Sequence, residues 1–220
     1  LLIVEPVLMA PLRREWEALK AECAAMKAEA AGESEKKRAV VTRRIGEKLR
    51  AFADRIAAVR VLDPACGSGN FLYIALQLLL DLQHEVIAFS DEMGAGRFFI
   101  SVSPAQLYGI EINEYAHELA QVTIQIGYIQ WLVNNGYGLP ADPILKRIDN
   151  LQQRDAILAF DADGKPYEPE WPQADVIVGN PPFLGGNRIR AGLGNAYVDA
   201  LFKLYERRVA ASADLVCYWF

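Results

Sequence analysis

Hydrophobic residues recur at helical spacing through the first quarter of the chain. Between Pro11 and Ala31 they fall three or four positions apart, at Leu12, Trp16, Leu19, Cys23 and Met26, which predicts a helix. A second run with the same spacing follows Ser34, a residue type that often begins helices, and continues from Val41 to Val59. Residues 1–58 therefore predict an N-terminal helical hairpin that packs on the domain after it.

From residue 59 onward, short apolar strands alternate with longer helices. Strands are expected at 60–63, 106–111, 144–148 and 175–179, the third of them weak, and helices at 71–89 and 114–133. Residues 83–104, which overlap the end of the first of these helices, and residues 151–172 are expected to be loops or irregular. This order predicts an α/β domain over 59–220, a mostly parallel sheet with helices on both faces. Ligands of such sheets bind beyond the carboxyl ends of the strands.

Composition narrows the class of protein. The chain has 220 residues, of which 52% are hydrophobic and 23% charged, a globular mix that fits one core. The most apolar helix, at 71–89, carries five polar residues, Gln77, Asp81, Gln83, His84 and Glu85. They predict a buried helix rather than a membrane span.

Candidate metal ligands are few. The three cysteines lie far apart and there are only two histidines, so neither a disulfide framework nor a metal site is expected, and a reducing, cytoplasmic location fits. Asp161–Lys165 is typical of a turn rather than a calcium loop. Because the chain opens without Met and stops inside the apolar run 215–220, we interpret it as a piece of a longer protein.

A glycine-containing turn follows the first predicted strand. It reads Asp63-Pro64-Ala65-Cys66-Gly67-Ser68-Gly69-Asn70-Phe71 and leads into a helix. Glycines let a ligand approach the backbone, and a helix start offers free amides. The spacing matches neither the phosphate loop nor the full dinucleotide fingerprint. Asp63 suits an amine, so the turn indicates a ligand with an amino-acid moiety.

Two further acids stand after predicted strands. Glu111 ends the second strand, where a carboxylate can bind both hydroxyls of a ribose. Taken alone such an acid is simply exposed; next to the Asp63–Gly69 turn, the ligand interpretation is favoured. Asp155 and Ala156 follow the third strand, and Asp155 can receive an adenine amine.

Asn180-Pro181-Pro182-Phe183 follows the fourth predicted strand. Two prolines remove two amide donors, so the Asn180 side-chain oxygen and the Pro181 carbonyl can both accept from one amino group. Phe183 offers a ring on which a planar base can stack. The same residues could form a rigid turn only, but the other motifs favour a site.

Together these motifs resemble those of S-adenosylmethionine-dependent adenine-N(6) DNA methyltransferases, in the order typical of their gamma class. Val61–Leu72 and Asp214–Phe220 most resemble the methyltransferase part of large single-chain restriction-modification enzymes of the MmeI type and related phage-defence methylases. The resemblance covers most of residues 59–220. It implies a class I, Rossmann-like methyltransferase fold, S-adenosylmethionine as cofactor and double-stranded DNA as partner. It also implies a target recognition domain outside this chain, and it leaves open whether a nuclease domain is attached.

The resemblance assigns roles residue by residue. Glu111 would bind the ribose of the cofactor, Ile112 would pack on its adenine, and Asp155 beside Ala156 would bind the adenine amine. Asn180 and Pro181 would hold the target amine, with Pro182 beside them and Phe183 stacked on the flipped base. The methionine end of the cofactor would lie at the turn formed by Asp63, Pro64, Ala65, Cys66, Gly67, Ser68 and Gly69, with Phe71 after it.

Residues 184–196 hold Arg188, Arg190 and four glycines but no acid. We expect a mobile loop beside the target base whose arginines contact DNA phosphate. The other basic run, between Glu33 and Arg50, is interpreted as a solvated helix face, and the net charge of −5 does not favour a surface wholly devoted to nucleic acid.

Two alternatives remain open. Asn-Pro-Pro followed by an aromatic residue also occurs in enzymes similar to release-factor glutamine methyltransferases and ribosomal RNA guanine-amine methyltransferases. Those usually carry a turn richer in glycine than Asp63–Gly67. The second alternative is a non-catalytic cofactor-binding or assembly module.

Overall fold

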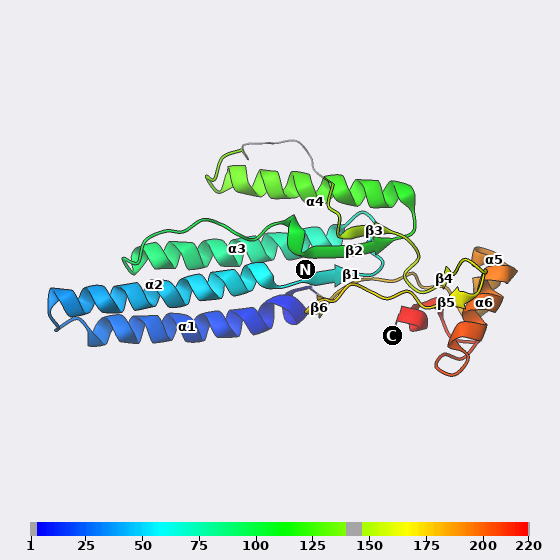
Figure 1. The fold of residues 1–220 in the computed structure, drawn as a ribbon, viewed down its shortest axis with the longest axis horizontal. Coiled ribbons are helices and arrows are strands. Elements are labelled where there is room, and N and C mark those ends of the chain that lie inside the picture. The colour runs from blue at the N-terminus through cyan, green and yellow to red at the C-terminus, as the bar shows by residue number, and fades with distance from the viewer. Residues whose placement is uncertain (1–3, 140–146, 220) are drawn as a thin grey trace.

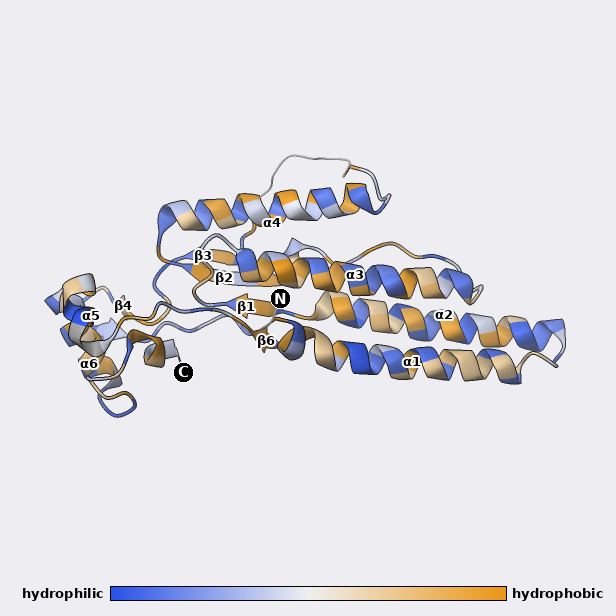
Figure 2. Cartoon of the chain, turned by 180° about the vertical axis from the view of Figure 1, so that it is seen from behind, coloured by the Kyte–Doolittle hydropathy of each residue, from blue (hydrophilic) through white to orange (hydrophobic). Residues whose placement is uncertain are grey.

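The computed structural model describes residues 4–139 and 147–219. A small central sheet has long helices extending beyond the amino ends of its strands, while shorter C-terminal elements lie beyond the carboxyl ends (Figure 1). The predicted hairpin is confirmed: a short π-helical turn, η1 (Glu5–Met9), leads into α1 (Ala10–Glu29), and α2 (Glu35–Ala58) returns beside it. Apolar and polar residues alternate along both helices (Figure 2), as expected of helices with one buried face.

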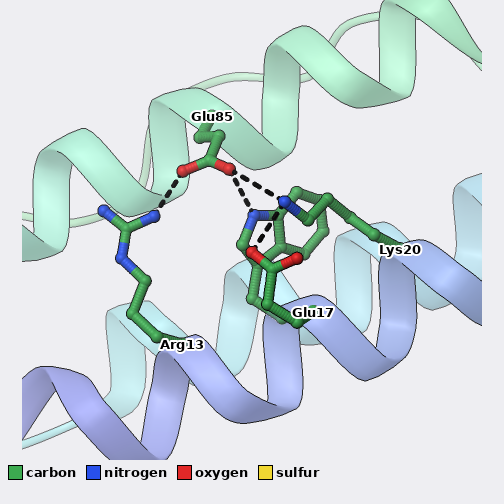
Figure 3. A network of polar contacts seen from close by, with 5 residues as sticks. Arg13, Glu17, Lys20 and Glu85 are labelled. Carbon is green, nitrogen blue, oxygen red and sulfur yellow. Dashed lines mark hydrogen bonds and ion pairs between the residues drawn. The ribbon is translucent and has the colours of Figure 1, made fainter.

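Aromatic packing and a shared carboxylate fix the hairpin to the rest of the domain. Trp16 of α1 stacks on Phe52 of α2, with ring centroids 5.7 Å apart. Its indole nitrogen donates to Glu85 of α3 (Asn70–Glu92) at 2.6 Å. Arg13 and Lys20 of α1 form ion pairs with the same carboxylate (Figure 3). Although burial alone would raise the pKa of Glu85, the bonds from Trp16 and Arg13 lower it.

The sheet has four parallel strands in the order β3-β2-β1-β6. These are β1 (Val61–Asp63), β2 (Leu107–Glu111), β3 (Leu151–Gln153) and β6 (Val176–Ile177). A short turn, η2 (Pro104–Gln106), precedes β2, and α4 (Glu114–Asn134) follows it. Because the chain goes from β1 to β2 and β3 and later adds β6 on the other side, the strand order reverses at β1. That point is where open α/β sheets bind ligands.

The two faces of the sheet contribute to two different hydrophobic cores. Val61 and Leu107 share a core with buried residues of α1, α2, α3 and α4. The neighbouring positions Leu62 and Ile110 face the other way, into a second core with Val198 and Leu201 of α6 (Asn195–Tyr205). This alternation confirms the predicted α/β sheet with helices on both faces.

The structure corrects the prediction of an irregular segment at 83–104, because α3 continues to Glu92. The polar side chain of Gln83 in α3 forms hydrogen bonds within the protein rather than with solvent. The buried Gln83 accepts from the amides of Ser101 and Val102 at 2.8 and 2.9 Å and donates to the Ala53 carbonyl at 2.9 Å. By length and composition, α3 is the one helix among the described residues that could cross a membrane. Its packing against α2, α4 and the sheet accounts for that composition.

The third strand was predicted in the wrong place. Residues 144–146 lie outside the described residues, and 147–148 are not a strand; β3 comes later, at Leu151–Gln153. The side chain of Gln121 in α4 pairs with both backbone groups of Ile148, so these groups need no partner strand. The segment 151–172 also contains a hairpin of β4 (Ala159–Phe160) and β5 (Pro166–Tyr167), joined by the predicted Asp161–Lys165 turn.

The prediction of a mobile loop at residues 184–196 is wrong. These residues contain α5 (Gly186–Leu193) and the start of α6. Ile189 is fully buried in the second core, which outweighs the low helix propensity of the glycines. Leu184 closes over Gly192, where an added Cβ would lie 2.9 Å from its side chain. The last described residues form a short 3-10 turn, η3 (Leu215–Trp219).

Candidate active site

The turn after β1 is built as a tight backbone cradle. Gly67 and Gly69 have φ angles of +53° and +82°, which other residues adopt only with strain. The Cys66 amide donates to the carbonyl of Ile110 in β2 at 3.0 Å, and the Gly69 amide donates to the Cys66 carbonyl at 2.8 Å. A Cβ on Gly69 would lie 3.1 Å from that of Ala120, so glycine lets α3 approach α4. Glycine is therefore needed in this turn for two structural reasons, the positive φ angles and the close packing against α4.

Asp63 ends β1 with a fully buried carboxyl group. One oxygen accepts from the Ala65 amide at 3.0 Å, and Oδ2 has no partner among the described residues. Burial, and to a smaller extent the charge of Glu111, raises the pKa of Asp63 to about 7, although the Ala65 bond acts against them. Unpaired buried oxygens are costly, and a cationic ligand group is the kind of partner that would offset the cost.

Glu111 lies at the end of the adjacent strand and is held by two backbone amides. Gly67 donates to its Oε2 at 2.8 Å and Asn113 to its Oε1 at 2.7 Å. The carboxylate is thus oriented across the β1 turn. Each oxygen keeps further acceptor capacity, which suits a diol.

Asp155 lies just after β3, at Leu151–Gln153, and not after the strand predicted at 144–148. Its Oδ1 accepts from the amides of Ile157 and Leu158 at 2.8 and 3.1 Å. Its Oδ2 accepts from the hydroxyl of Tyr197 in α6 at 2.7 Å. The carboxylate is therefore fixed from two sides by segments that are 42 residues apart in the chain.

The Asn180–Phe183 segment leaves β6 beside Asp63. Gly179 is required there, since an added Cβ would lie 2.6 Å from Asp63 Oδ1. Pro181 is buried and the Asn180 side chain is exposed, with no hydrogen bond to it from any described residue. Asp214 accepts from the Leu184 amide at 3.0 Å and holds the end of this segment in place.

One cavity of about 610 Å³ joins these elements. From the predicted set it is lined by Pro64, Ala65, Glu111, Ile112, Asp155, Ala156, Asn180 and Pro182. The volume falls in the range of small-molecule sites, roughly 300–1,000 Å³. Residues predicted from four separate segments therefore line one cavity at the carboxyl ends of the strands.

Ten predicted residues do not line this cavity: Asp63, Cys66, Gly67, Ser68, Gly69, Phe71, Pro181, Phe183, Arg188 and Arg190. Cys66 is buried, and its thiol pKa is raised to about 12 by burial first and then by Asp63 and Glu111, so it is an unreactive packing group. Phe71 packs against the main core. Phe183 is 70% exposed beside the site. Arg188 and Arg190 lie on α5, where Arg190 pairs with Asp199 at 2.8 Å.

Eight lining residues lie outside the predicted set, and three of them have side chains that form hydrogen bonds: Arg154, Tyr197 and Trp219. Arg154 neighbours a predicted residue, but its guanidinium is occupied by Gln152 and the Glu170 carbonyl. Tyr197 and Trp219 come from the segment after Phe183, and the Trp219 indole donates to the Pro64 carbonyl at 3.4 Å. A local motif carries no signal for such distant contacts.

The parallel sheet, its reversal at β1 and the acid-tipped strands define a Rossmann-like α/β domain of the methyltransferase type. Residues 33–220 match the family described as MmeI, DNA-methyltransferase domain, and the chain belongs to that family. The expected resemblance is confirmed, and the match includes α2 of the hairpin.

Two known proteins show the same relationship. DNA methyltransferase A of Bacillus subtilis (strain 168) is 31% identical over 147 residues, which are 64% of this chain and 16% of that protein. The match to the structure of the Type IIL restriction-modification enzyme MmeI in complex with DNA covers 96% of this chain and 27% of the MmeI chain, with a TM-score of 0.64 and 22% identity. The likeness to the MmeI structure supports the Rossmann-like fold of this chain. The chain spans about a sixth and about a quarter of these two proteins.

Proposed function

We propose that the chain is the catalytic part of a DNA methyltransferase that transfers the methyl group of S-adenosylmethionine to the exocyclic amine of a flipped-out adenine. The observation that carries this proposal is the single cavity lined both by Glu111 and Asp155, after β2 and β3, and by Asn180, after β6. Such a cavity lets a cofactor and a target amine meet at one place, and the family membership supports the same activity.

The residues present fit the cofactor. Asp63 has a buried oxygen without a partner among the described residues, which suits the methionine ammonium group. Glu111 is oriented by two amides and can accept from the ribose hydroxyls. Asp155 can accept from the adenine amine, and the exposed Ile112 can pack on the ring. When bound, S-adenosylmethionine supplies a methyl group on an electron-poor sulfonium.

The target amine would be activated by hydrogen bonding and not by a strong base. Asn180 Oδ1 and the Pro181 carbonyl would accept hydrogen bonds from its two N–H groups, which favours a pyramidal nitrogen whose lone pair points at the methyl carbon. S-adenosylmethionine held by Asp63, Glu111 and Asp155 would supply that methyl group, and its sulfur would keep the electron pair of the carbon–sulfur bond as a nitrogen–carbon bond replaces it. The surplus proton then leaves to solvent. The rate gain comes from orientation and charge placement.

Double-stranded DNA is the proposed partner, and its base must leave the helix to reach the cavity. The exposed Phe183 would stack on that base, and Arg188 and Arg190 on α5 would meet phosphates. The longer relatives support further target-recognition and nuclease parts in the intact protein, which we place in the cytoplasm of a cell with a restriction-modification or phage-defence system.

Asn180→Ala tests the assignment in the intact protein. Its single-turnover methylation of duplex DNA should fall about a hundredfold or more, whereas its affinity for S-adenosylmethionine should change little. Asn180→Asp keeps acceptor oxygens in place and should lose less. Labelled methyl groups should appear in N(6)-methyladenine. Label found in guanine or in glutamine would refute the adenine proposal, and an unchanged Asn180→Ala rate would refute the role of the acceptor.

A further inference from the structure

Asp155 and Tyr197 form a fixed pair at the wall of the cavity. Both line it, and they come from opposite sides: Asp155 follows β3, and Tyr197 lies in the first half of α6. The hydroxyl of Tyr197 is 2.7 Å from Asp155 Oδ2. This distance is that of a charge-assisted hydrogen bond.

The acceptor positions of Asp155 are nearly used up. An ionised carboxylate has about four acceptor positions, two on each oxygen. The amides of Ile157 and Leu158 use both positions on Oδ1, and Tyr197 uses one on Oδ2. One acceptor position on Oδ2 therefore remains for a ligand.

The direction of the Tyr197 bond is also determined. Burial, together with the bond to Asp155 and its charge, raises the pKa of Tyr197 well above its ordinary value. The hydroxyl stays protonated and donates, and the carboxylate only accepts. A ligand group at the remaining position must then be a donor, because an oxygen there would face the carboxylate charge.

Tyr197 is held firmly enough to orient its partner. The next residue, Val198, and Leu201 one turn later are fully buried in the core that contains Leu62 and Ile110 of the sheet. The hydroxyl of Tyr205, on the same helix, donates to the Ile157 carbonyl at 2.8 Å. Both tyrosines of α6 thus donate hydrogen bonds to the segment after β3, but of the two only Tyr197 contacts the Asp155 carboxylate.

We propose that Tyr197 is a positioning residue that holds the Asp155 carboxylate for a six-amino purine and so makes the site reject a six-oxo purine. This inference rests on the proposed function, since it names the group that sets adenosine specificity at the proposed cofactor site. The selectivity arises because the carboxylate, locked by its donors, accepts from an amine but repels a carbonyl oxygen.

Calorimetry on the intact protein tests the inference with two probes, S-adenosylhomocysteine and its counterpart with inosine in place of adenosine. The wild type should prefer the adenosine compound. Tyr197→Phe should reduce that preference about tenfold, since a bond to a charged group is lost. Tyr205→Phe is the matched control: it removes a hydroxyl bond to the same segment and should leave the preference unchanged.

A double-mutant cycle separates positioning from packing. Asp155→Asn should also reduce the preference, and adding Tyr197→Phe to it should change the preference little further, because the two residues act as one unit. Equal weakening of both probes in Tyr197→Phe, or an unchanged preference, would overturn the inference while leaving the proposed function intact. A wild-type protein that binds neither probe would overturn both.

Discussion

Asp63→Asn should change how the stability of the protein depends on pH. The Asp63 carboxyl is fully buried, and its pKa is raised from 3.8 to about 7, chiefly by that burial. Between these two values the unfolded chain has released the proton that the folded protein still holds. The unfolding free energy contributed by this group therefore falls as the pH rises from about 4 to 7, and then stays constant.

The magnitude follows from the two pKa values. Each pH unit in this window is worth about 1.4 kcal/mol, so the ionised carboxyl destabilises the ligand-free protein by about 4 kcal/mol above pH 7. The amide that Asp63→Asn introduces cannot ionise. It keeps an acceptor for the Ala65 amide and places an unpaired amide nitrogen at the other position, at a pH-independent cost of about 1–3 kcal/mol.

The assay is urea unfolding of both proteins at pH 5 and pH 8. The unfolding free energy of Asp63→Asn minus that of the wild type should rise by about 2.5 kcal/mol between the two pH values. Asp175→Asn is the control. The backbone and side-chain bonds of Arg60 lower the pKa of Asp175, so this carboxyl is ionised at both pH values. The unfolding free energy of Asp175→Asn minus that of the wild type should therefore be the same at pH 5 and pH 8. Parallel curves for the wild type and Asp63→Asn would refute the reasoning.

Two further predictions concern the ligands. Gly67→Asp puts a charged side chain at a positive φ angle of 53° beside Glu111. Backbone strain should lower the unfolding free energy by about 1–2 kcal/mol, so the protein should still fold, but calorimetry should detect no binding of S-adenosylmethionine. Retained affinity would contradict the assignment of the turn. Replacing both Arg188 and Arg190 by Ala in the intact protein should lower the salt slope of DNA binding by up to about two units without changing site preference. Lys36→Ala with Arg38→Ala, on the exposed face of α2, should leave the slope unchanged, and an equal effect of both pairs would argue against a phosphate contact by α5.

The parts of the site that could be predicted from the sequence are those encoded within a few consecutive residues. The Asp63–Gly69 turn and Asn180–Phe183 each combine a strand end with residues of restricted or permissive backbone. Because parallel strands bring such ends together at one edge of the sheet, the proximity of these segments can be predicted without knowing how side chains pack. The roles assigned to the individual residues remain predictions, as does the domain boundary at residue 58.

The remaining features depend on contacts between distant segments. Gln83 lies where the predicted helix overlaps the predicted irregular segment, and its bonds with Ser101 and Val102, which explain a polar residue in the core, involve residues 18 and 19 positions away. The edge strand β3 is polar, so no apolar run marks it. The glycines of α5 indicate a loop, but the burial of Ile189 stabilises a helix there. Tyr197 reaches Asp155 across 42 residues, a separation at which local patterns carry no information.

The reversal of strand order at β1 has a consequence for the order of folding. The Gly67–Glu111 bond closes a segment of 44 residues, whereas the Arg60–Asp175 bond beside β6 closes one of 115. Contacts between distant residues form more slowly, and chains fold from the N-terminus during synthesis. We expect the β1 turn and Glu111 to come together first, while the edge of β1 beside Asp63 stays open. The short β6 then adds itself to that edge, so Asn180 takes its place only in the last stage of folding.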